Sequence, residues 1–152
     1  MIRETAEEER ELKEVRFVNW LSIKKVLSDK ELMELENELG ITLPADYKDI
    51  IVEINGGALK NAVIQHPKVG TIAYSRNVSL NKEAKANIFE LLPLFNDDII
   101  RYFPFASVGN GDYYCFDLSN EQVVLYMHEC DEYIHVCESF SQLLEMLSEY
   151  NQ

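Results

Sequence analysis

The sequence lacks any long uninterrupted hydrophobic run. Its two most apolar stretches, residues 49–55 and 88–95, are broken by Glu53 in the first and by Glu90 and Pro93 in the second. Both fall short of the roughly 18 apolar residues that a transmembrane helix needs. The first eleven residues are acidic, whereas a secretory signal begins with a basic segment followed by an apolar one. These features predict no membrane association and a cytoplasmic location.

Basic residues are scarce. The chain has 14 lysines and arginines against 27 aspartates and glutamates, so its net charge is -13 at pH 7. A charge of this sign repels the phosphates of nucleic acids and of anionic lipids, and it attracts basic proteins. We therefore expect a protein partner and no nucleic acid. A role of the acidic residues in solubility alone is the alternative.

Cysteine is scarce too, and the three cysteines form an odd number that fits free thiols in a reducing compartment. Two of them belong to His-x-Cys pairs, His128 with Cys130 and His135 with Cys137, which are residue types that bind zinc. In the strand pairing predicted below, Cys137 lies roughly 13 Å along the sheet from His128, although zinc ligands must converge on one ion. We expect no metal.

Motifs of catalysis and of cofactor binding are missing. No Gly-x-Ser-x-Gly sequence occurs, and the six glycines match neither a P-loop nor a dinucleotide-binding fingerprint. We expect no catalytic residue and no cofactor. A nucleophilic triad built on one of the three histidines is the enzymatic alternative.

Amphipathic helices dominate the first third of the chain. Residues 3–19 have helical spacing of their apolar positions. Ser28 to Glu31 form a capping box, and Gly40 ends the helix that follows. Pro44 suits the first position of another helix, which ends at residues 55–57. Its apolar stripe consists of Tyr47, Ile50, Ile51 and Ile54.

Strand-like segments dominate the rest. Residues 58–75 are weakly β-like, residues 81–87 read as a polar loop or short helix, and residues 88–95 fit either a helix or a strand. Four runs rich in aromatic and β-branched residues follow, at 103–108, 113–118, 123–128 and 133–138, and a capped helix begins near Phe140. The order predicts an α+β fold, in which helices pack on one face of an antiparallel meander sheet.

A register follows if each turn joins neighbouring strands, so that Val108 pairs with Tyr113, Leu118 with Val123, and His128 with Tyr133. One face then is almost entirely apolar and must pack on the helices; it carries Phe103, Phe105, Tyr114, Phe116, Leu118, Val123, Leu125, Met127, Ile134 and Val136. The other face is mixed, with the rows Tyr113, His128 and Tyr133, then Cys115, Tyr126 and His135, then Asp117, Val124 and Cys137.

Two loops meet at one end of this meander and place carboxylates beside tyrosines. Tyrosines next to charge on a half-exposed surface are typical of binding hot spots. The predicted partner-binding residues are Asp112, Tyr113, His128, Glu129, Asp131, Glu132 and Tyr133. The alternative is that another segment covers this face and that the acidic turns only keep it soluble.

Residues 32–57 resemble the signature of the SUKH superfamily: a Glu-rich helix ending in Leu-Gly, then Leu-Pro-x-x-Tyr and a helix ending in Asn-Gly-Gly. Residues 103–118 and the Ser-Phe-Ser-Gln-Leu-Leu segment near the end look like the later strands and closing helix of that family. The resemblance starts near Leu27 and implies one SUKH-like domain over residues 1–152, with residues 1–27 as an N-terminal helical extension. The motif residues look structural, so they transfer the fold and no binding site.

The resemblance also implies a function. Bacterial members of the superfamily act as immunity proteins that neutralise polymorphic toxins, often nucleases. We therefore expect a non-enzymatic antitoxin that binds a cognate toxin, with a basic nuclease domain as the partner. The alternative is a scaffold or regulatory protein-interaction module, as the eukaryotic members imply.

Overall fold

The structure is a computed structural model that describes residues 20–23 and 25–150. The helix predicted at residues 3–19 lies outside these residues. Four helices are described: α2 (Asp29–Leu39), α3 (Ala45–Ile54), α4 (Ile88–Phe95) and α5 (Phe140–Met146). The strands are β1 (Ala62–His66), β2 (Gly70–Ala73), β3 (Arg76–Asn77), β4 (Tyr102–Ser107), β5 (Tyr113–Asp117), β6 (Gln122–Met127), β7 (Glu132–Cys137) and β8 (Ser148–Glu149).

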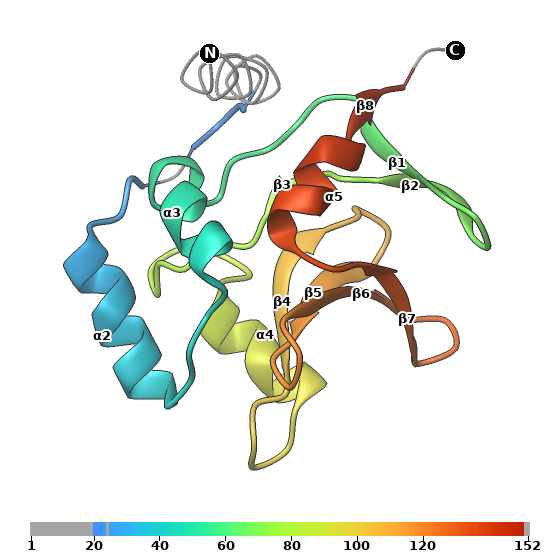
Figure 1. Cartoon of the computed structure of the whole chain (residues 1–152). Helices are drawn as coiled ribbons and strands as arrows, with labels where there is room; N and C mark the ends of the chain where they lie inside the picture. Colours follow the sequence, from blue (N-terminus) through green and yellow to red (C-terminus); the bar gives the residue numbers. More distant parts are fainter. Residues whose placement is uncertain (1–19, 24, 151–152) are drawn as a thin grey trace, which may run out of the picture.

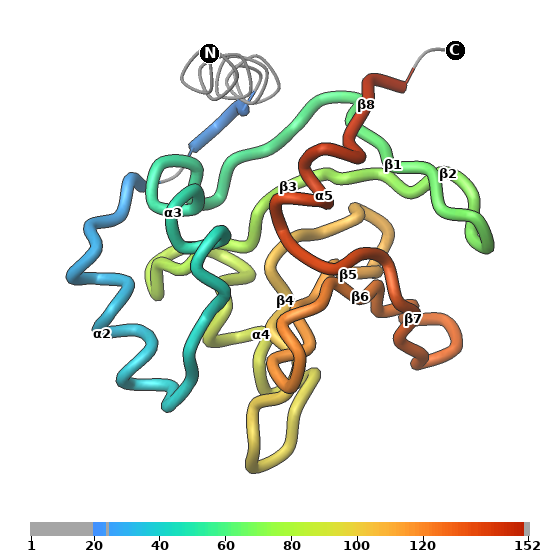
Figure 2. The backbone as a smooth tube through the Cα atoms, in the orientation of Figure 1, coloured from blue at the N-terminus to red at the C-terminus, as the bar shows by residue number. Residues whose placement is uncertain are grey.

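The strands form two antiparallel sheets. The larger one has the order β3-β4-β5-β6-β7, and the smaller one has the order β2-β1-β8. Figure 2 shows the continuous up-and-down path of the chain from β4 to β7. The predicted α+β class and the antiparallel meander are confirmed.

Helices α3 and α5 pack on one face of the larger sheet (Figure 1). Tyr47 of α3 is fully buried, and its ring makes edge contacts with four aromatic rings from the sheet and from α5. Those rings belong to Phe103, Phe105, Phe116 and Phe140, at centroid distances of 5.0 to 6.2 Å. The apolar face predicted from the alternation of residues is thus the face that forms the core.

The helix ends follow local capping rules. Ser28 and Glu31 form the predicted capping box, and Gly40 ends α2 in the left-handed conformation at φ 68°. The sequence predicts Pro44 as the first residue of α3. In the structure Pro44 is the N-cap, and the helix begins at Ala45. Residues 88–95, which fit either a helix or a strand in the sequence, form the helix α4. Asn87 caps this helix, and its first residue, Ile88, is fully buried.

The predicted register is wrong by one residue at the β4–β5 hairpin, where Ser107 and not Val108 pairs with Tyr113. It is wrong by two residues at the β5–β6 and β6–β7 hairpins. Asp117 pairs with Gln122, and Met127 pairs with Glu132. Asp117 closes its turn early because its Oδ1 atom accepts hydrogen bonds from the backbone N–H and the hydroxyl of Ser119, at 3.1 and 2.6 Å. A shift of two residues keeps every side chain on its predicted face.

Two bulges change the faces locally. One lies between Pro104 and Ala106, and the other lies between Val123 and Val124. The second bulge pairs Cys137 with Val123, so the Cys137 side chain belongs to the core. Its predicted place opposite Val124 on the mixed face is therefore wrong.

Candidate protein-binding surface

A single row of side chains crosses the larger sheet on the face opposite α3. Arg76 pairs with Ser107, Ser107 with Tyr113, Tyr113 with Tyr126, and Tyr126 with Tyr133. We call these five residues the cross-strand row. Directly paired residues of an antiparallel sheet share a face, so the row runs over all five strands, roughly 19 Å at the usual strand spacing.

Two further aromatic side chains extend the row. The ring of Phe95, at the end of α4, meets Tyr113 and Tyr126 edge to face, with centroids 5.6 and 5.0 Å away. The ring of Tyr102 stacks on Tyr133 at 3.8 Å. All five aromatic side chains are half-buried. The prediction that helices pack on one face of the sheet is therefore incomplete. Phe95 at the end of α4 also contacts the opposite face.

The tyrosine hydroxyls of the row keep their protons at neutral pH. Burial raises the pKa of Tyr113 and of Tyr133 above the ordinary value. The pKa of Tyr126 is also raised, chiefly because its hydroxyl donates a 2.8 Å hydrogen bond to Asp131. The row therefore offers flat apolar rings with neutral polar tips.

Acidic turns border the β6–β7 end of the row. The Oδ1 atom of Asp112 accepts a hydrogen bond from the backbone N–H of His128 at 3.0 Å and lies 2.5 Å from its Nδ1 atom. This contact ties the β4–β5 turn to the β6–β7 turn, which contains Glu129 and Asp131 in exposed positions. Glu132 follows at the exposed start of β7.

The structure thus brings the seven predicted residues to one end of the meander, but one of them, His128, does not occupy its predicted position in the sheet. His128 lies in the turn and outside the cross-strand row, and Tyr126 takes the position that was predicted for it. The sequence interpretation missed Tyr102 and Phe95. The Asp-x-Ser spacing of Asp117 and Ser119, which is typical of a side-chain-closed turn, is the signal that could have corrected the register.

The two His-x-Cys pairs are separated in space. Cys137 is 3% exposed within the core, whereas His128 and Cys130 lie in an exposed turn. Among residues 20–23 and 25–150, no group of three or more potential ligands is arranged to hold a metal ion.

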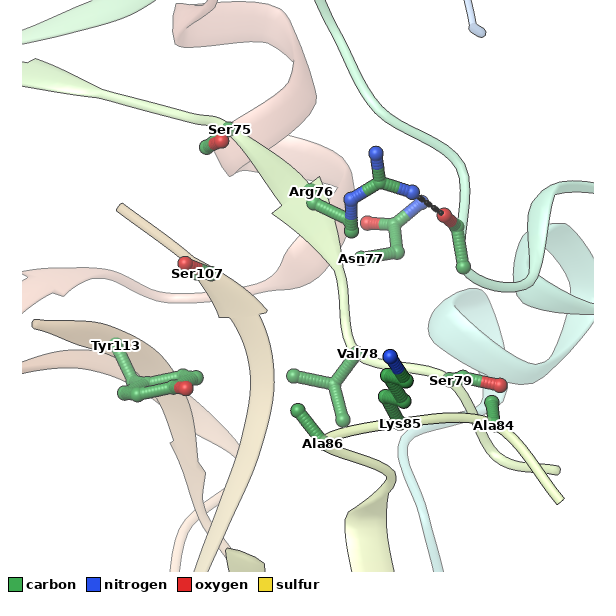
Figure 3. Close-up of a pocket in the computed structure, with 11 residues that line it drawn as sticks. Ser75, Arg76, Asn77, Val78, Ser79, Ala84, Lys85, Ala86, Ser107 and Tyr113 are labelled. Atoms are coloured by element: carbon green, nitrogen blue, oxygen red, sulfur yellow. Dashed lines mark hydrogen bonds between the residues drawn. The ribbon is translucent and has the colours of Figure 1, made fainter. Parts of the chain in front are cut away.

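A pocket of about 510 Å³ opens at the β3 end of the row (Figure 3). Arg76, Ser107 and Tyr113 of the row line it, together with Lys85 and Val78. The sequence interpretation did not identify this pocket, because its lining comes from separate loops and strands that share no motif.

The fold is of the α+β class, with antiparallel sheets and helices. The chain belongs to the SMI1 / KNR4 family (SUKH-1), whose model matches residues 26–146. Domains of this family are known as immunity proteins in polymorphic toxin systems, and the family is non-enzymatic. No curated protein matches the chain. Within the described part of the chain, no helix is both long and apolar enough to cross a bilayer.

Proposed function

We propose that this chain is a cytoplasmic immunity protein that binds and neutralises a cognate nuclease toxin, with no catalytic step of its own. The observation that carries the proposal is the cross-strand row, in which three neighbouring half-buried tyrosines lie beside four carboxylates. The carboxylates belong to Asp112, Glu129, Asp131 and Glu132.

The tyrosines supply the binding energy in this proposal. Tyrosine buries a large area at a small entropic cost, since only two side-chain torsions must be fixed. Here Tyr126 and Tyr133 are already held, by the hydrogen bond to Asp131 and by the stack on Tyr102. Because these side chains are ordered before binding, less conformational entropy is lost when the complex forms.

The carboxylates supply the attraction. A nuclease must present cationic residues to hold the phosphate backbone of its substrate, and a protein of net charge -13 is complementary to such a surface. Exposed charges at the edge of an interface chiefly raise the association rate, and their effect falls as salt rises.

The first test takes a secreted protein with a C-terminal nuclease domain from a neighbouring gene as the candidate toxin and measures its affinity by calorimetry. Tyr133→Ala should weaken binding by about 30-fold, which corresponds to about 2 kcal/mol for a buried aromatic anchor. Tyr150→Ala is the matched control, because Tyr150 is 46% exposed and follows β8 of the other sheet. Equal losses in both variants, or none in either, contradict the proposed surface.

The second test addresses charge. The double variant Glu129→Lys and Glu132→Lys should slow association and flatten its dependence on salt. The control double variant, Glu34→Lys and Glu53→Lys, makes the same change in net charge on the exposed sides of α2 and α3. If both double variants slow association equally, only net charge matters. If the toxin is neither bound nor inhibited, the immunity function fails.

A further inference from the structure

The pocket at the β3 end of the cross-strand row has a charge opposite to that of the chain. It is lined by two cationic residues, Arg76 and Lys85, and no acidic residue lines it. The whole chain carries 27 acidic and 14 basic residues. Two cations with no acidic residue in the same lining favour an anionic ligand over a cationic one.

One of the two cations is held in place by the backbone. The Nη1 atom of Arg76 donates a 2.9 Å hydrogen bond to the carbonyl oxygen of Gly56 (Figure 3). A guanidinium group has five N–H donors in a planar fork, so this bond fixes its orientation and leaves donors for a ligand. Lys85 makes no ion pair with any residue in the described ranges.

Serine hydroxyls add further donors. The Oγ atom of Ser79 accepts the backbone N–H of Asn81 at 3.2 Å, and that of Ser107 accepts the N–H of Gly109 at 3.0 Å. A hydroxyl that accepts a hydrogen bond keeps its own proton to donate. Both residues line the pocket, so these hydroxyls suit an acceptor-rich ligand.

Another part of the lining is apolar. Val78, Ala86 and the half-buried ring of Tyr113 line the pocket, and Figure 3 shows Val78 and Ala86 between Lys85 and Tyr113. Its volume of about 510 Å³ falls in the range of small-molecule sites, roughly 300 to 1,000 Å³. The pocket therefore combines two cationic side chains with an apolar surface that includes the ring of Tyr113.

We propose that this pocket binds a small organic anion, in which a phosphate or carboxylate group meets Arg76 and Lys85 and an apolar or aromatic body packs on Val78 and Tyr113. The pocket shares Arg76, Ser107 and Tyr113 with the cross-strand row, but the proposal goes beyond the immunity function, and its test needs no toxin. A bare anion would leave the apolar wall uncovered, and an uncharged aromatic compound would leave the two cations unpaired.

The experiment is a titration of the full chain with phenyl phosphate, followed by two-dimensional amide NMR. Saturable shifts are expected at residues 75–79 and at Lys85. Inorganic phosphate lacks the aromatic ring, and phenol lacks the anionic group. Each should therefore bind at least about 10-fold more weakly than phenyl phosphate. The absence of saturable shifts, or equal binding of inorganic phosphate, overturns the proposal.

Variants locate the site. Lys85→Gln should weaken phenyl phosphate binding several-fold, and Arg76→Gln should weaken it at least about 10-fold because the guanidinium fork is lost. Lys60→Gln is the control, since Lys60 is exposed and does not line the pocket. Arg76 also bonds Gly56, so Lys85→Gln keeps the test valid if Arg76→Gln misfolds. Unchanged affinity in Lys85→Gln, or an equal loss in Lys60→Gln, contradicts the assignment.

Discussion

The rings of Tyr102 and Tyr133 stack face to face, with centroids 3.8 Å apart and planes 9° from parallel, although β4 and β7 are separated by two strands. A flat sheet would hold side chains on strands so far apart at well over 10 Å. The larger sheet therefore curls so that its second face is concave. This curvature gathers the aromatic side chains of that face into one surface.

The stack should contribute to stability. A double-mutant cycle of Tyr102→Ala and Tyr133→Ala, measured by urea unfolding, should give a coupling free energy of about 0.5 to 1.5 kcal/mol. The control cycle pairs Tyr102→Ala with Tyr150→Ala, whose rings lie on different sheets, and should give none. Equal coupling in the two cycles contradicts the stack.

Ile51 should be essential to the core. It is fully buried in α3, so Ile51→Ala should lower the free energy of unfolding by about 2 to 5 kcal/mol through lost burial and the cavity left behind. Met33→Ala in α2, where the side chain is 59% exposed, should change it by less than about 0.5 kcal/mol. A thermal midpoint that Ile51→Ala leaves unchanged would show that α3 is rotated.

The hydroxyl of Tyr47 should contribute nothing to stability. It is fully buried and has no hydrogen-bond partner among the described residues, and an unpaired buried polar group costs about 1 to 3 kcal/mol. Tyr47→Phe should therefore leave the free energy of unfolding unchanged or raise it. Tyr114→Phe is the control, because that buried hydroxyl donates to the Ala73 carbonyl at 3.0 Å, and its loss should cost about 1 kcal/mol. A large loss in Tyr47→Phe contradicts this account.

Asp117 should make stability depend on pH in the acid range. Its side chain is mostly buried, which by itself raises the pKa, but hydrogen bonds from Arg101 and Ser119 outweigh burial and lower the pKa below the ordinary value. The unfolded chain therefore binds a proton more readily than the folded one. The stabilisation is complete above the unfolded pKa, near about 3.9, and is lost as pH falls through the folded pKa.

The measurement compares thermal midpoints of the wild type and Asp117→Asn from pH 7 to pH 2. The difference between them should be constant near neutrality and should shrink below about pH 4. Asp98→Asn, at an exposed position after α4, should follow the wild type throughout. A difference between wild type and Asp117→Asn that is the same at every pH contradicts the assigned ion pair.

The three thiols should differ in reactivity. Cys130 is exposed, whereas Cys115 and Cys137 are buried, and burial raises the pKa of both, to about 11 for Cys137. Because the thiolate is the reactive form, Ellman's reagent should modify one thiol per native chain and three after denaturation. Cys130→Ser should abolish the native reaction. Rapid labelling of two or more native thiols contradicts the burial of Cys115 and Cys137.

Much of the fold could be predicted from the sequence because it depends on local rules. The capping box at Ser28, the left-handed Gly40 and the four strands of the meander follow from residue type and periodicity, and each strand begins and ends within one residue of its prediction. Periodicity alone predicted the wrong register, because closure of the β5–β6 turn depends on hydrogen bonds of the Asp117 side chain, which only the Asp-x-Ser spacing indicates. The faces of β5 and of most of β6 and β7 agree with the prediction, since the error at those hairpins was an even number of residues; the two bulges moved Ser107 and Cys137 to the other face.

The sequence by itself determined the apolar face of the meander, with Cys137 as the exception, and it determined the family, whose model matches residues 26–146. Only the tertiary structure decided that Tyr126 replaces His128 in the cross-strand row, that Tyr102 meets Tyr133, and that Arg76 and Lys85 share a pocket. Periodicity reports neighbours within one element. Contacts between elements depend on turn closure, on bulges and on the curl of the sheet, and these are set by interactions between residues far apart in the chain.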